Sequence, residues 1–477
     1  MSASSRELDE EAEEGLLSGA HKSSVHHLAT PRLGRVLKKM LPTALIIGFL
    51  VFLMAPPDHS KTHSDEHFLE NGPHEWAQYS PYTPQANYTL PPSGCQINQV
   101  HIRHGARYPT SGATDRIMRA VWKLLSVKEY KDPRFKFLKG FSYDLGVDDL
   151  VPFGADQSFK AGEEAFMRYS YLIGLDSLPF VRASSAERVV ISALNWTSGF
   201  AAASEYIFQP SLSVVLSEAA NDTLDDKMCP SAGSSDAQTS VWLAQYAPPV
   251  TKHLNDAAPG ANLTDVDTFS LMSLCPFESV AKRRKSEFCT IFESQTGAFP
   301  GFSYSGDLDK YYGTGYGEPL GPVQGVGYVN ELLARLTSKP VEDHTQTNHT
   351  LDSSPETFPL NRTLYADFSH DNAMIAIFSA MGLFKQPAVE PLDPSKPHDA
   401  RVWRVGAIVP FSGRMVVERL ACDTSTMVRI LVNDKVQPLE LCGASGDGLC
   451  TLDAFVSSQA YARNGSDADW ASCRLEA

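Results

Sequence analysis

Near position 100, a short apolar run passes through a glycine turn into a segment with helical periodicity. The run contains Ile97, Val100 and Ile102, and the turn is Arg103-His104-Gly105-Ala106-Arg107-Tyr108-Pro109. Its glycine lets backbone N–H groups approach a ligand closely, and the two arginines can bind phosphate oxygens through planar guanidinium groups. A neutral imidazole held between them can attack phosphorus directly. The stretch therefore predicts an anion pocket with His104 as nucleophile and with Arg103 and Arg107 as anion ligands.

The same stretch has two other interpretations. It can be an ordinary strand end with a solvated arginine, a core histidine and a turn glycine, but this order of residues is rare by chance. His101 and His104, three residues apart, can suggest a metal site. A cation there would lie among the fixed charges of Arg103 and Arg107. We therefore expect no metal ion and no other cofactor.

The length and charge of the chain limit its architecture and its partners. With 477 residues, it exceeds what one hydrophobic core usually organises, so we expect two lobes. A formal net charge of -15 argues against nucleic acid as a partner. An acidic protein that binds an anion must concentrate positive charge locally, and an acidic working pH helps by neutralising carboxylates elsewhere. We expect a monomer that acts on a phosphorylated small molecule.

The first 94 residues divide into three segments. Residues 1–39 are polar and predict a disordered cytoplasmic tail, whereas residues 40–55 are almost wholly apolar and follow a basic cluster. This apolar run reaches the short limit of a membrane span, and its leader is longer than that of a cleaved signal peptide. Positive charge before the run predicts a type II anchor, with the catalytic part outside the cell or in a lumen. Secretion after cleavage is the alternative. Residues 56–94 predict a proline-rich stalk that becomes ordered toward its end.

Glycosylation sequons and cysteines support this topology. All seven sequons follow the apolar run, at Asn87, Asn195, Asn221, Asn262, Asn348, Asn361 and Asn464. All eight cysteines also follow it, and none forms the closely spaced pair that zinc sites use. An even number of cysteines in an extracellular or luminal chain predicts disulfides, whose pairing the spacing alone leaves open.

A second strand and helix start is expected near residue 183. The segment Phe180-Val181-Arg182-Ala183 predicts a short strand, and Ser184 with Glu187 predicts a capping box that starts a helix toward Gly199. Because Arg182 lies near the strand end and beside a helix start, it is placed where anions bind in α/β folds. Taken alone, it would more often be a surface residue.

A third strand and helix start carries His370 and Asp371. The residues 363–368 predict a buried strand, and an apolar helix follows that ends at Gly382. Asp371 is a natural helix N-cap. Its functional interpretation is the acid that protonates the leaving oxygen of a phosphate ester, with His370 binding the phosphate.

Three other segments have ordinary structural interpretations. A core-facing helix is predicted by the spacing of Ile117, Val121, Leu124 and Leu125, with Met118 and Trp122 widening the apolar stripe. The ranges 415–418 and 428–432 predict strands, with a turn at Asn433-Asp434. Lys282-Arg283-Arg284-Lys285 predicts a solvated basic loop; a processing site and a rim for a charged anion are the alternatives.

Together, these residues resemble the fungal phytase branch of the histidine acid phosphatase superfamily. The resemblance rests on 103–109, Arg182 and His370-Asp371, covers residues 74–477, and is dense at 310–313, 325–328, 330–336 and 365–372. It implies an α/β fold: a phosphoglycerate-mutase-like α/β sandwich domain with a second, mostly helical domain. Within a phosphatase domain at 95–477, we expect the α/β core at 95–122, 178–215 and 325–477 and the helical lobe at 123–177 and 216–324.

The resemblance also implies roles for single residues. His104 would be the phosphohistidine nucleophile and Asp371 the general acid, and the phosphate would bind to Arg103, Arg107, Arg182 and His370. The implied disulfides are Cys95–Cys422, Cys229–Cys473, Cys275–Cys289 and Cys442–Cys450. The implied activity is the removal of phosphate from myo-inositol hexakisphosphate, or phytate, at acidic pH.

Two departures from the family pattern bear on this expectation. Members specialised for phytate carry lysines shortly after the first motif, whereas residues 111–116 offer only Arg116. Lys310, and the basic segment at 282–285, can compensate in part as a substrate rim. The membrane anchor is the second departure, because similar enzymes are mostly secreted. A broad-specificity acid phosphatase and a catalytically silent anion-binding ectodomain are therefore the alternatives.

Overall fold

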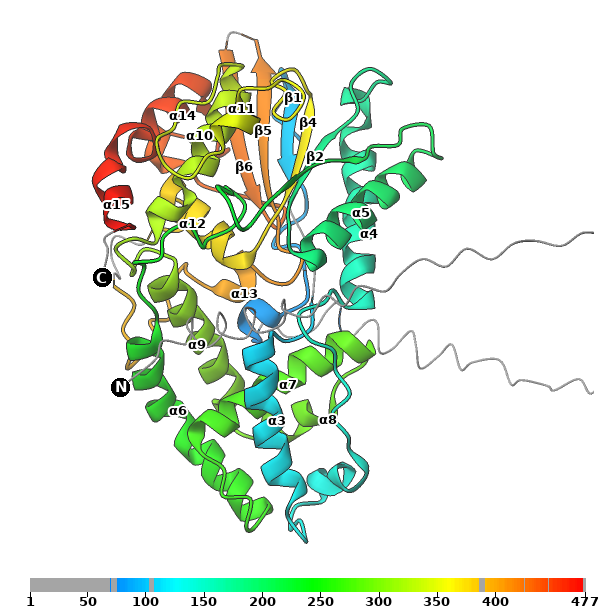
Figure 1. Cartoon of the computed structure of the whole chain (residues 1–477), viewed down its shortest axis with the longest axis vertical. Coiled ribbons are helices and arrows are strands. Elements are labelled where there is room, and N and C mark those ends of the chain that lie inside the picture. Colours follow the sequence, from blue (N-terminus) through cyan, green and yellow to red (C-terminus); the bar gives the residue numbers. More distant parts are fainter. Residues whose placement is uncertain are drawn as a thin grey trace, which may run out of the picture.

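The structure is a computed structural model that describes residues 69, 75–102, 107–385, 391–423, 425–444 and 446–474. A sheet with helices on both faces forms one half of the molecule, and a group of helices forms the other (Figure 1). The predicted tail and membrane anchor, and nearly all of the stalk up to residue 74, lie outside the described residues. Within the described ranges, no helix combines the length and apolar character that a membrane span requires.

Eight strands form one mixed sheet, in the order β3-β2-β4-β1-β5-β6-β7, with β8 paired to β6. Four neighbouring strands run parallel: β1 (Cys95–Ile102), β2 (Phe180–Ser184), β3 (Leu212–Leu216) and β4 (Leu364–Phe368). The others pair antiparallel: β5 (Met415–Cys422), β6 (Ser425–Val432), β7 (Lys435–Val436) and β8 (Cys450–Thr451). Because parallel strands end at the same edge, the segments that follow β1 to β4 meet where ligands bind in α/β sheets. The expected α/β class and strands are confirmed.

One face of the sheet is covered by α4 (Pro152–Tyr169) and α5 (Glu187–Ala203). These two helices approach each other so closely that only glycine fits at the contact. An added Cβ at Gly162 would lie 2.0 Å from the carbonyl oxygen of Trp196, and one at Gly199 would lie 2.0 Å from that of Phe159. The other face packs against α10 (Val326–Thr337), α12 (Asp371–Met381) and α14 (Leu452–Ser458).

The helical half contains α3 (Ser111–Leu125), α6 (Asp236–Ala257), α7 (Asp265–Lys282), α8 (Glu287–Glu293) and α9 (Ala298–Gly313). Three short helices complete the fold: α11 (His349–Asp352), α13 (Val405–Ile408) and α15 (Asp467–Ser472). Helix α3 buries Ile117, Val121 and Leu124, as predicted, but Trp122 is 72% exposed and Met118 and Leu125 are also exposed. The buried stripe is therefore narrower than predicted, because one neighbouring helix, α7, covers only part of α3.

The packing of two helices differs from the expected division into core and lobe. The expected α/β core includes residues 95–122, yet α3 packs against α7 in the helical half. The expected helical lobe includes residues 123–177, yet α4 packs against α5 beside the sheet. Sequence order does not reveal this exchange, since both helices are amphipathic and either layer can bury an apolar face.

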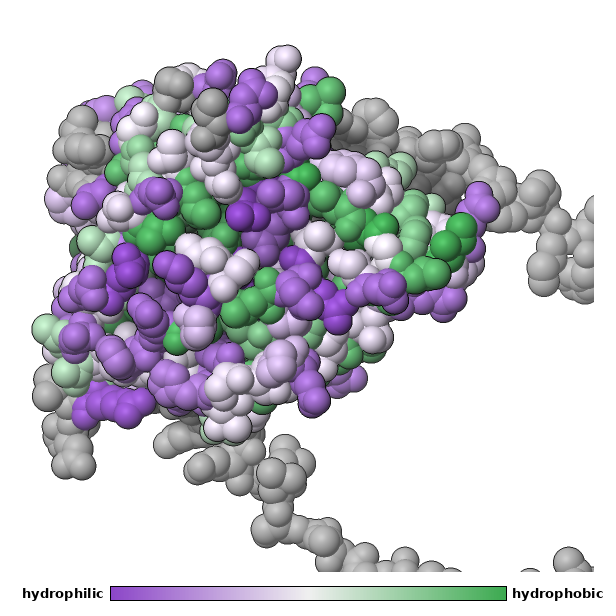
Figure 2. All heavy atoms as spheres, turned by 90° about the horizontal axis from the view of Figure 1, so that it is seen from above, coloured by the Kyte–Doolittle hydropathy of each residue, from purple (hydrophilic) through white to green (hydrophobic). Residues whose placement is uncertain are grey.

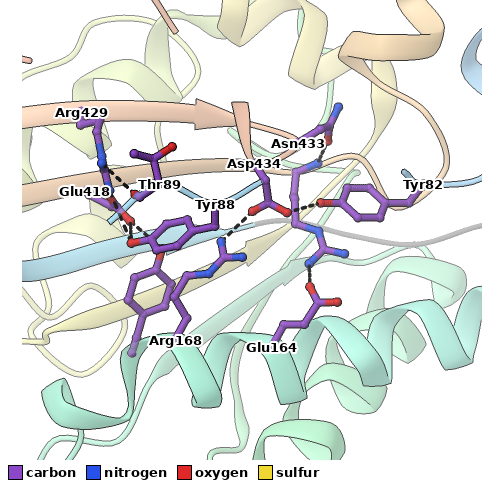
Figure 3. A network of polar contacts seen from close by, with 11 residues as sticks. Tyr82, Tyr88, Thr89, Glu164, Arg168, Glu418, Arg429, Asn433 and Asp434 are labelled. Carbon is purple, nitrogen blue, oxygen red and sulfur yellow. Dashed lines mark hydrogen bonds and ion pairs between the residues drawn. The ribbon is translucent and has the colours of Figure 1, made fainter. Parts of the chain in front are cut away.

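The segment 75–94, at the end of the expected stalk, forms an arm that packs against the sheet (Figure 3). The Tyr82 hydroxyl donates to Asp434 at 2.8 Å, and the Tyr88 hydroxyl donates to the buried Glu418 at 2.9 Å. Arg429 donates to Glu418 at 2.7 Å and to the carbonyl oxygen of Thr89 at 3.1 Å. This buried network fixes the arm at several points, so the arm is part of the folded body.

The four disulfides are those that the family resemblance implies: Cys95–Cys422, Cys229–Cys473, Cys275–Cys289 and Cys442–Cys450. The first joins two residues that are paired directly across β1 and β5. None of the seven sequon asparagines is buried: Asn87, Asn262, Asn361 and Asn464 are exposed, and Asn195, Asn221 and Asn348 are partly exposed. The disulfides are compatible with an oxidising compartment, and the exposure of the asparagines is compatible with glycosylation.

The surface carries mixed hydrophilic and hydrophobic residues, and the view in Figure 2 shows the hydrophobic ones in small groups. In the basic segment at 282–285, Lys282 pairs with Asp144 at 3.0 Å, and Lys285 pairs with Glu293 at 2.5 Å. Arg283 pairs with Asp156. Much of the positive charge of this segment is thus neutralised by adjacent carboxylates, which favours the solvated loop over an anion-binding rim.

Candidate active site

A pocket lies at the carboxyl edge of the parallel strands. Four charged or titratable residues line it, Arg107, Arg188, His370 and Asp371. The other described residues of its wall are mainly apolar: Gln78, Leu150, Val189, Ser192, Met374, Val409, Pro410, Phe411 and Gly413. Arg103 and His104 fall in the segment 103–106, outside the described residues. The chain enters that segment from β1, at Ile102, and leaves it at Arg107 in the pocket wall.

Two arginines bring positive charge into the pocket. Arg107 donates to the carbonyl oxygen of Tyr108 at 2.9 Å, and Arg188 lies in the first turn of α5. Burial, together with the positive charge of Arg107, lowers the pKa of Arg188. Two like charges in a partly buried wall repel each other, and an anion bound between them would relieve that repulsion. The two positive charges therefore favour anion binding in the pocket, and the N-terminus of α5 beside Arg188 favours it further.

Arg182 does not reach the pocket. Its side chain is 1% exposed and forms ion pairs with Glu331 at 2.6 Å and with Asp367 at 2.7 Å. Arg335 also pairs with Asp367, at 2.6 Å. Burial acts to raise the pKa of Asp367, but the two arginines hold it well below its usual range. This position does not suit the phosphate-binding role expected for Arg182; Arg188, six residues later, occupies the pocket instead.

The helix start at α5 also differs from the expectation. Ala186, rather than Ser184, precedes the first helical residue, and no side chain caps it. The Ser184 hydroxyl lies 2.9 Å from Glu218 and 2.6 Å from Asp222, both in the segment that follows β3. The predicted capping box with Glu187 is therefore wrong, because these tertiary acceptors take the hydroxyl.

His370 and Asp371 lie at the start of α12, directly after β4. His370, not Asp371, is the N-cap residue, and Asp371 is the first residue of the helix. Nε2 of His370 lies 3.0 Å from Oε1 of Glu218, and Nδ1 lies 3.4 Å from a guanidinium nitrogen of Arg188. The imidazole is thus held between a carboxylate and a pocket arginine.

The two residues expected at a substrate rim have different positions. Lys310, on α9, is only 7% exposed, and its ammonium group lies 3.1 Å from Asp371 and 2.6 Å from Oδ1 of Asn372. Arg116, on α3, is partly exposed and is not one of the described residues that line the pocket. Lys310 therefore touches the expected general acid from inside the fold.

One group of possible metal ligands occurs in the described ranges. Glu218, Asp225 and His370 place one ligand atom each within 4.8 Å of one another. Glu218 and His370 already bond to each other directly, and Arg188 lies against the opposite side of the imidazole. A divalent cation here would have to break that hydrogen bond beside a fixed positive charge, so the donor set fits a hydrogen-bonded network better than a metal centre.

Sequence reasoning missed three residues at this site. Arg188 could have been found as a basic residue in the first turn of a helix that starts at the anion-binding edge. Gln78 comes from the N-terminal arm and Glu218 from the segment after β3, and neither stands in a recognisable local motif. Only the tertiary fold brings Gln78 to the pocket and Glu218 to His370.

Comparison with known proteins identifies the family of the chain. Residues 96–433 match the histidine phosphatase superfamily (branch 2). Phytase A of Aspergillus awamori is 37% identical over 471 residues, which are 91% of this chain and 98% of the relative. Phytase A of Arthroderma benhamiae is 40% identical over 428 residues, 84% of this chain and 92% of the relative.

Solved structures agree on the fold. The crystal structure of the phytase from D. castellii superposes with a TM-score of 0.66 at 21% identity, covering 88% of this chain and 91% of that one. A multiple inositol polyphosphate phosphatase from Bifidobacterium longum, in complex with inositol hexasulfate, gives a TM-score of 0.57 at 15% identity over 80% and 96% of the two chains. From its sequence match and its full-length relatives, the chain belongs to branch 2 of the histidine phosphatase superfamily.

Proposed function

We propose that this protein is a histidine acid phytase, a phosphomonoester hydrolase that releases phosphate from phytate at acidic pH. The observation that carries the proposal is the convergence of Arg107, Arg188, His370 and Asp371 in one pocket. Arginine and histidine donors suit a phosphate, and a carboxyl group suits protonation of its ester oxygen. Relatives named Phytase A, which align over most of both chains, support phytate as the substrate.

The proposed reaction has two steps. In the first, the imidazole of His104 attacks phosphorus, the phosphorus–oxygen ester bond breaks, and Asp371 gives its proton to the leaving oxygen. Arg103, Arg107 and Arg188 stabilise the negative charge on the other phosphate oxygens. In the second step, water attacks the phosphohistidine and releases inorganic phosphate, while the Asp371 carboxylate takes a proton from that water. Arg188 here replaces Arg182 as the third arginine.

A broad-specificity acid phosphatase is the second candidate. It is favoured by the wall of the pocket, where Leu150, Met374 and Phe411 offer apolar contacts to an aryl or alkyl group. It is also favoured by the inward position of Lys310, which places its charge against Asp371 rather than at a rim. Phytate carries several phosphates and would gain more than a simple ester from cations around the pocket.

Phosphate release by the purified chain at a pH of about 5 tests both candidates. A phytase would have a higher kcat/KM for phytate than for an aryl phosphate, and a general acid phosphatase would have the reverse. Chelator should leave either activity unchanged, since no step uses a metal. His104→Ala should abolish both activities; substantial turnover by this variant would contradict the proposed mechanism.

We also propose that residues 40–55 anchor the enzyme with its catalytic part outside the cell or in a lumen. The disulfides and the accessible sequon asparagines support this topology. Endoglycosidase treatment should lower the apparent mass of the membrane-bound protein. Unglycosylated protein, or protein found wholly in the medium, would contradict an uncleaved anchor.

A further inference from the structure

Glu218 is fixed from several sides directly behind His370. Its Oε1 atom lies 3.0 Å from the backbone nitrogen of Ala186, 2.9 Å from the Ser184 hydroxyl and 3.0 Å from Nε2 of His370. Its own backbone N–H donates to the Ser185 hydroxyl at 3.1 Å. These contacts join the ends of β2, β3 and β4, so the carboxylate cannot move without disturbing the edge of the sheet.

The charge of Glu218 decides which nitrogen of His370 carries a proton in the free site. Burial acts to raise the pKa of Glu218, but the hydrogen bonds from His370 and Ser184 hold it well below its usual range. An ionised carboxylate can only accept hydrogen bonds, so Nε2 must be protonated and must donate. On the pocket side, Nδ1 faces Arg188, whose guanidinium can only donate, so Nδ1 is an acceptor while no anion is bound.

A bound phosphate requires Nδ1 to be a hydrogen-bond donor instead of an acceptor. Its oxygens accept from Arg188 and need a donor from the imidazole, so His370 must then carry protons on both nitrogens. We propose that Glu218 is a positioning residue that orients His370 through Nε2 and stabilises its protonated form, so that Nδ1–H can donate to the substrate phosphate. This inference rests on the proposed function and adds a residue that acts through His370 without touching substrate.

The other charged groups around His370 act in the same direction or are weaker. Asp225 lies 4.0 Å from Nε2, and burial with the charge of Asp226 raises its pKa to about 6, against the lowering effect of His370. Asp222 accepts from Ser184 and from the backbone of Leu224 and lies within electrostatic reach of His370, and burial raises its pKa. Lys227 lies 3.6 Å from the second oxygen of Glu218 but is largely exposed, so solvent screens it.

Among the described residues, Arg188 on α5 faces the imidazole from the pocket side, and Asp371 follows His370 at the start of α12. Arg188 opposes protonation of the imidazole, and a bound phosphate would neutralise that opposition. Below pH 6, where Asp225 is largely neutral, Glu218 is the carboxylate in direct hydrogen-bond contact that remains ionised. The stabilising charge therefore comes mainly from Glu218.

The test compares Glu218→Gln with wild type across the pH range. Glutamine keeps an acceptor oxygen and the size of the side chain but removes the charge. We expect the alkaline limb of kcat/KM to move to lower pH by about one unit, so that the loss is small near pH 4 and about tenfold near pH 7. Glu129→Gln, at an exposed glutamate after α3, is the matched control and should follow wild type. An unshifted Glu218→Gln profile, or an equal loss at every pH, would overturn the proposal.

A second measurement needs no variant at Glu218. Calorimetry of sulfate binding in buffers of different ionisation enthalpy counts the protons taken up, and sulfate itself takes up none in this range. We expect uptake of about one proton by wild type near pH 7, and none by His370→Asn. Absence of uptake by wild type would overturn the proposal even if Glu218→Gln does not fold. If the chain hydrolyses no ester, the proposed function fails, and the sulfate measurement still decides whether His370 takes up a proton when an anion binds, as the proposal requires.

Discussion

The ammonium nitrogen of Lys310 lies 3.1 Å from Oδ2 of Asp371, so a buried lysine is paired with the expected general acid. Burial acts to lower the pKa of Lys310, but the charges of Asp371 and Asp309 raise it above its usual value. The lysine therefore stays charged at every working pH and favours the ionised form of Asp371 in the free enzyme. Its role is electrostatic control of the acid, which differs from the substrate-rim role expected from the sequence.

Replacing this lysine by a neutral side chain of similar length tests that role. In Lys310→Met, Asp371 should stay protonated to higher pH, so the alkaline limb of kcat should move upward. Because Lys310 points at Asp371, the change in kcat/KM should be similar for phytate and for an aryl phosphate. A loss confined to phytate would instead identify Lys310 as a ligand of the additional phosphates.

Substitutions of the two candidate arginines should have different effects, on activity for Arg188 and on stability for Arg182. Arg188→Ala should lower kcat/KM by about 10²–10³, because it removes a donor to the phosphate. Its free energy of unfolding should change little. Kinetics with both substrates and urea unfolding of the same preparation measure the two effects. Wild-type kinetics in Arg188→Ala would remove this residue from the phosphate site.

Arg182→Met should show the opposite pattern. It leaves Glu331 without its ion-pair partner in the core, and Asp367 with only Arg335, so the free energy of unfolding should fall by about 3–5 kcal/mol. The folded fraction should keep a KM near that of wild type. A stable Arg182→Met variant with strongly raised KM would restore Arg182 as a phosphate ligand.

The sequence predicted the parts of the site that depend on local patterns. His370 and Asp371 could be placed because a buried strand, a polar turn and an apolar helix follow each other within 20 residues. Whether Arg182 faces the pocket or the core could not be predicted, because a residue near a strand end can do either, and only the carboxylates of Glu331 and Asp367 decide which.

The other wrong predictions, for Ser184 and Trp122, also arise because tertiary packing, and not the local sequence pattern, decides what a side chain contacts. Ser184 is a good capping residue in isolation, but Glu218 and Asp222 arrive from the segment after β3 and take its hydroxyl. Trp122 extends the apolar stripe of α3, yet the neighbouring helix does not reach it. For Ser184, contacts with residues more than 30 positions away override the local capping pattern. For Trp122, no helix within the described residues covers the side chain, so the apolar pattern does not lead to burial.

The stability of the fold should depend on the ionisation of Asp225. Burial and the charge of Asp226 raise its pKa to about 6 in the folded state, so folding favours its protonated form. Its contribution to stability is therefore fully present below about pH 4, its unfolded pKa, and is lost progressively as the pH rises from there through about 6. Asp225→Asn should nearly match wild type at pH 4 and be more stable at pH 7, by about 2 kcal/mol. Urea unfolding at the two pH values measures this, and lower stability of the variant at pH 7 would show that the carboxylate is needed.

The role of Asp371 as proton donor can be tested through the leaving group. An inositol alkoxide is a poor leaving group and needs a proton as the ester bond breaks, whereas a nitrophenolate leaves without one. Asp371→Asn keeps the position at the start of α12 and a similar shape but cannot give up a proton at working pH. We expect kcat for phytate to fall by about 10²–10⁴ and kcat for a nitrophenyl phosphate to fall much less. Equal losses for both esters would mean that Asp371 binds the phosphate or shapes the pocket, and that the proton comes from another group.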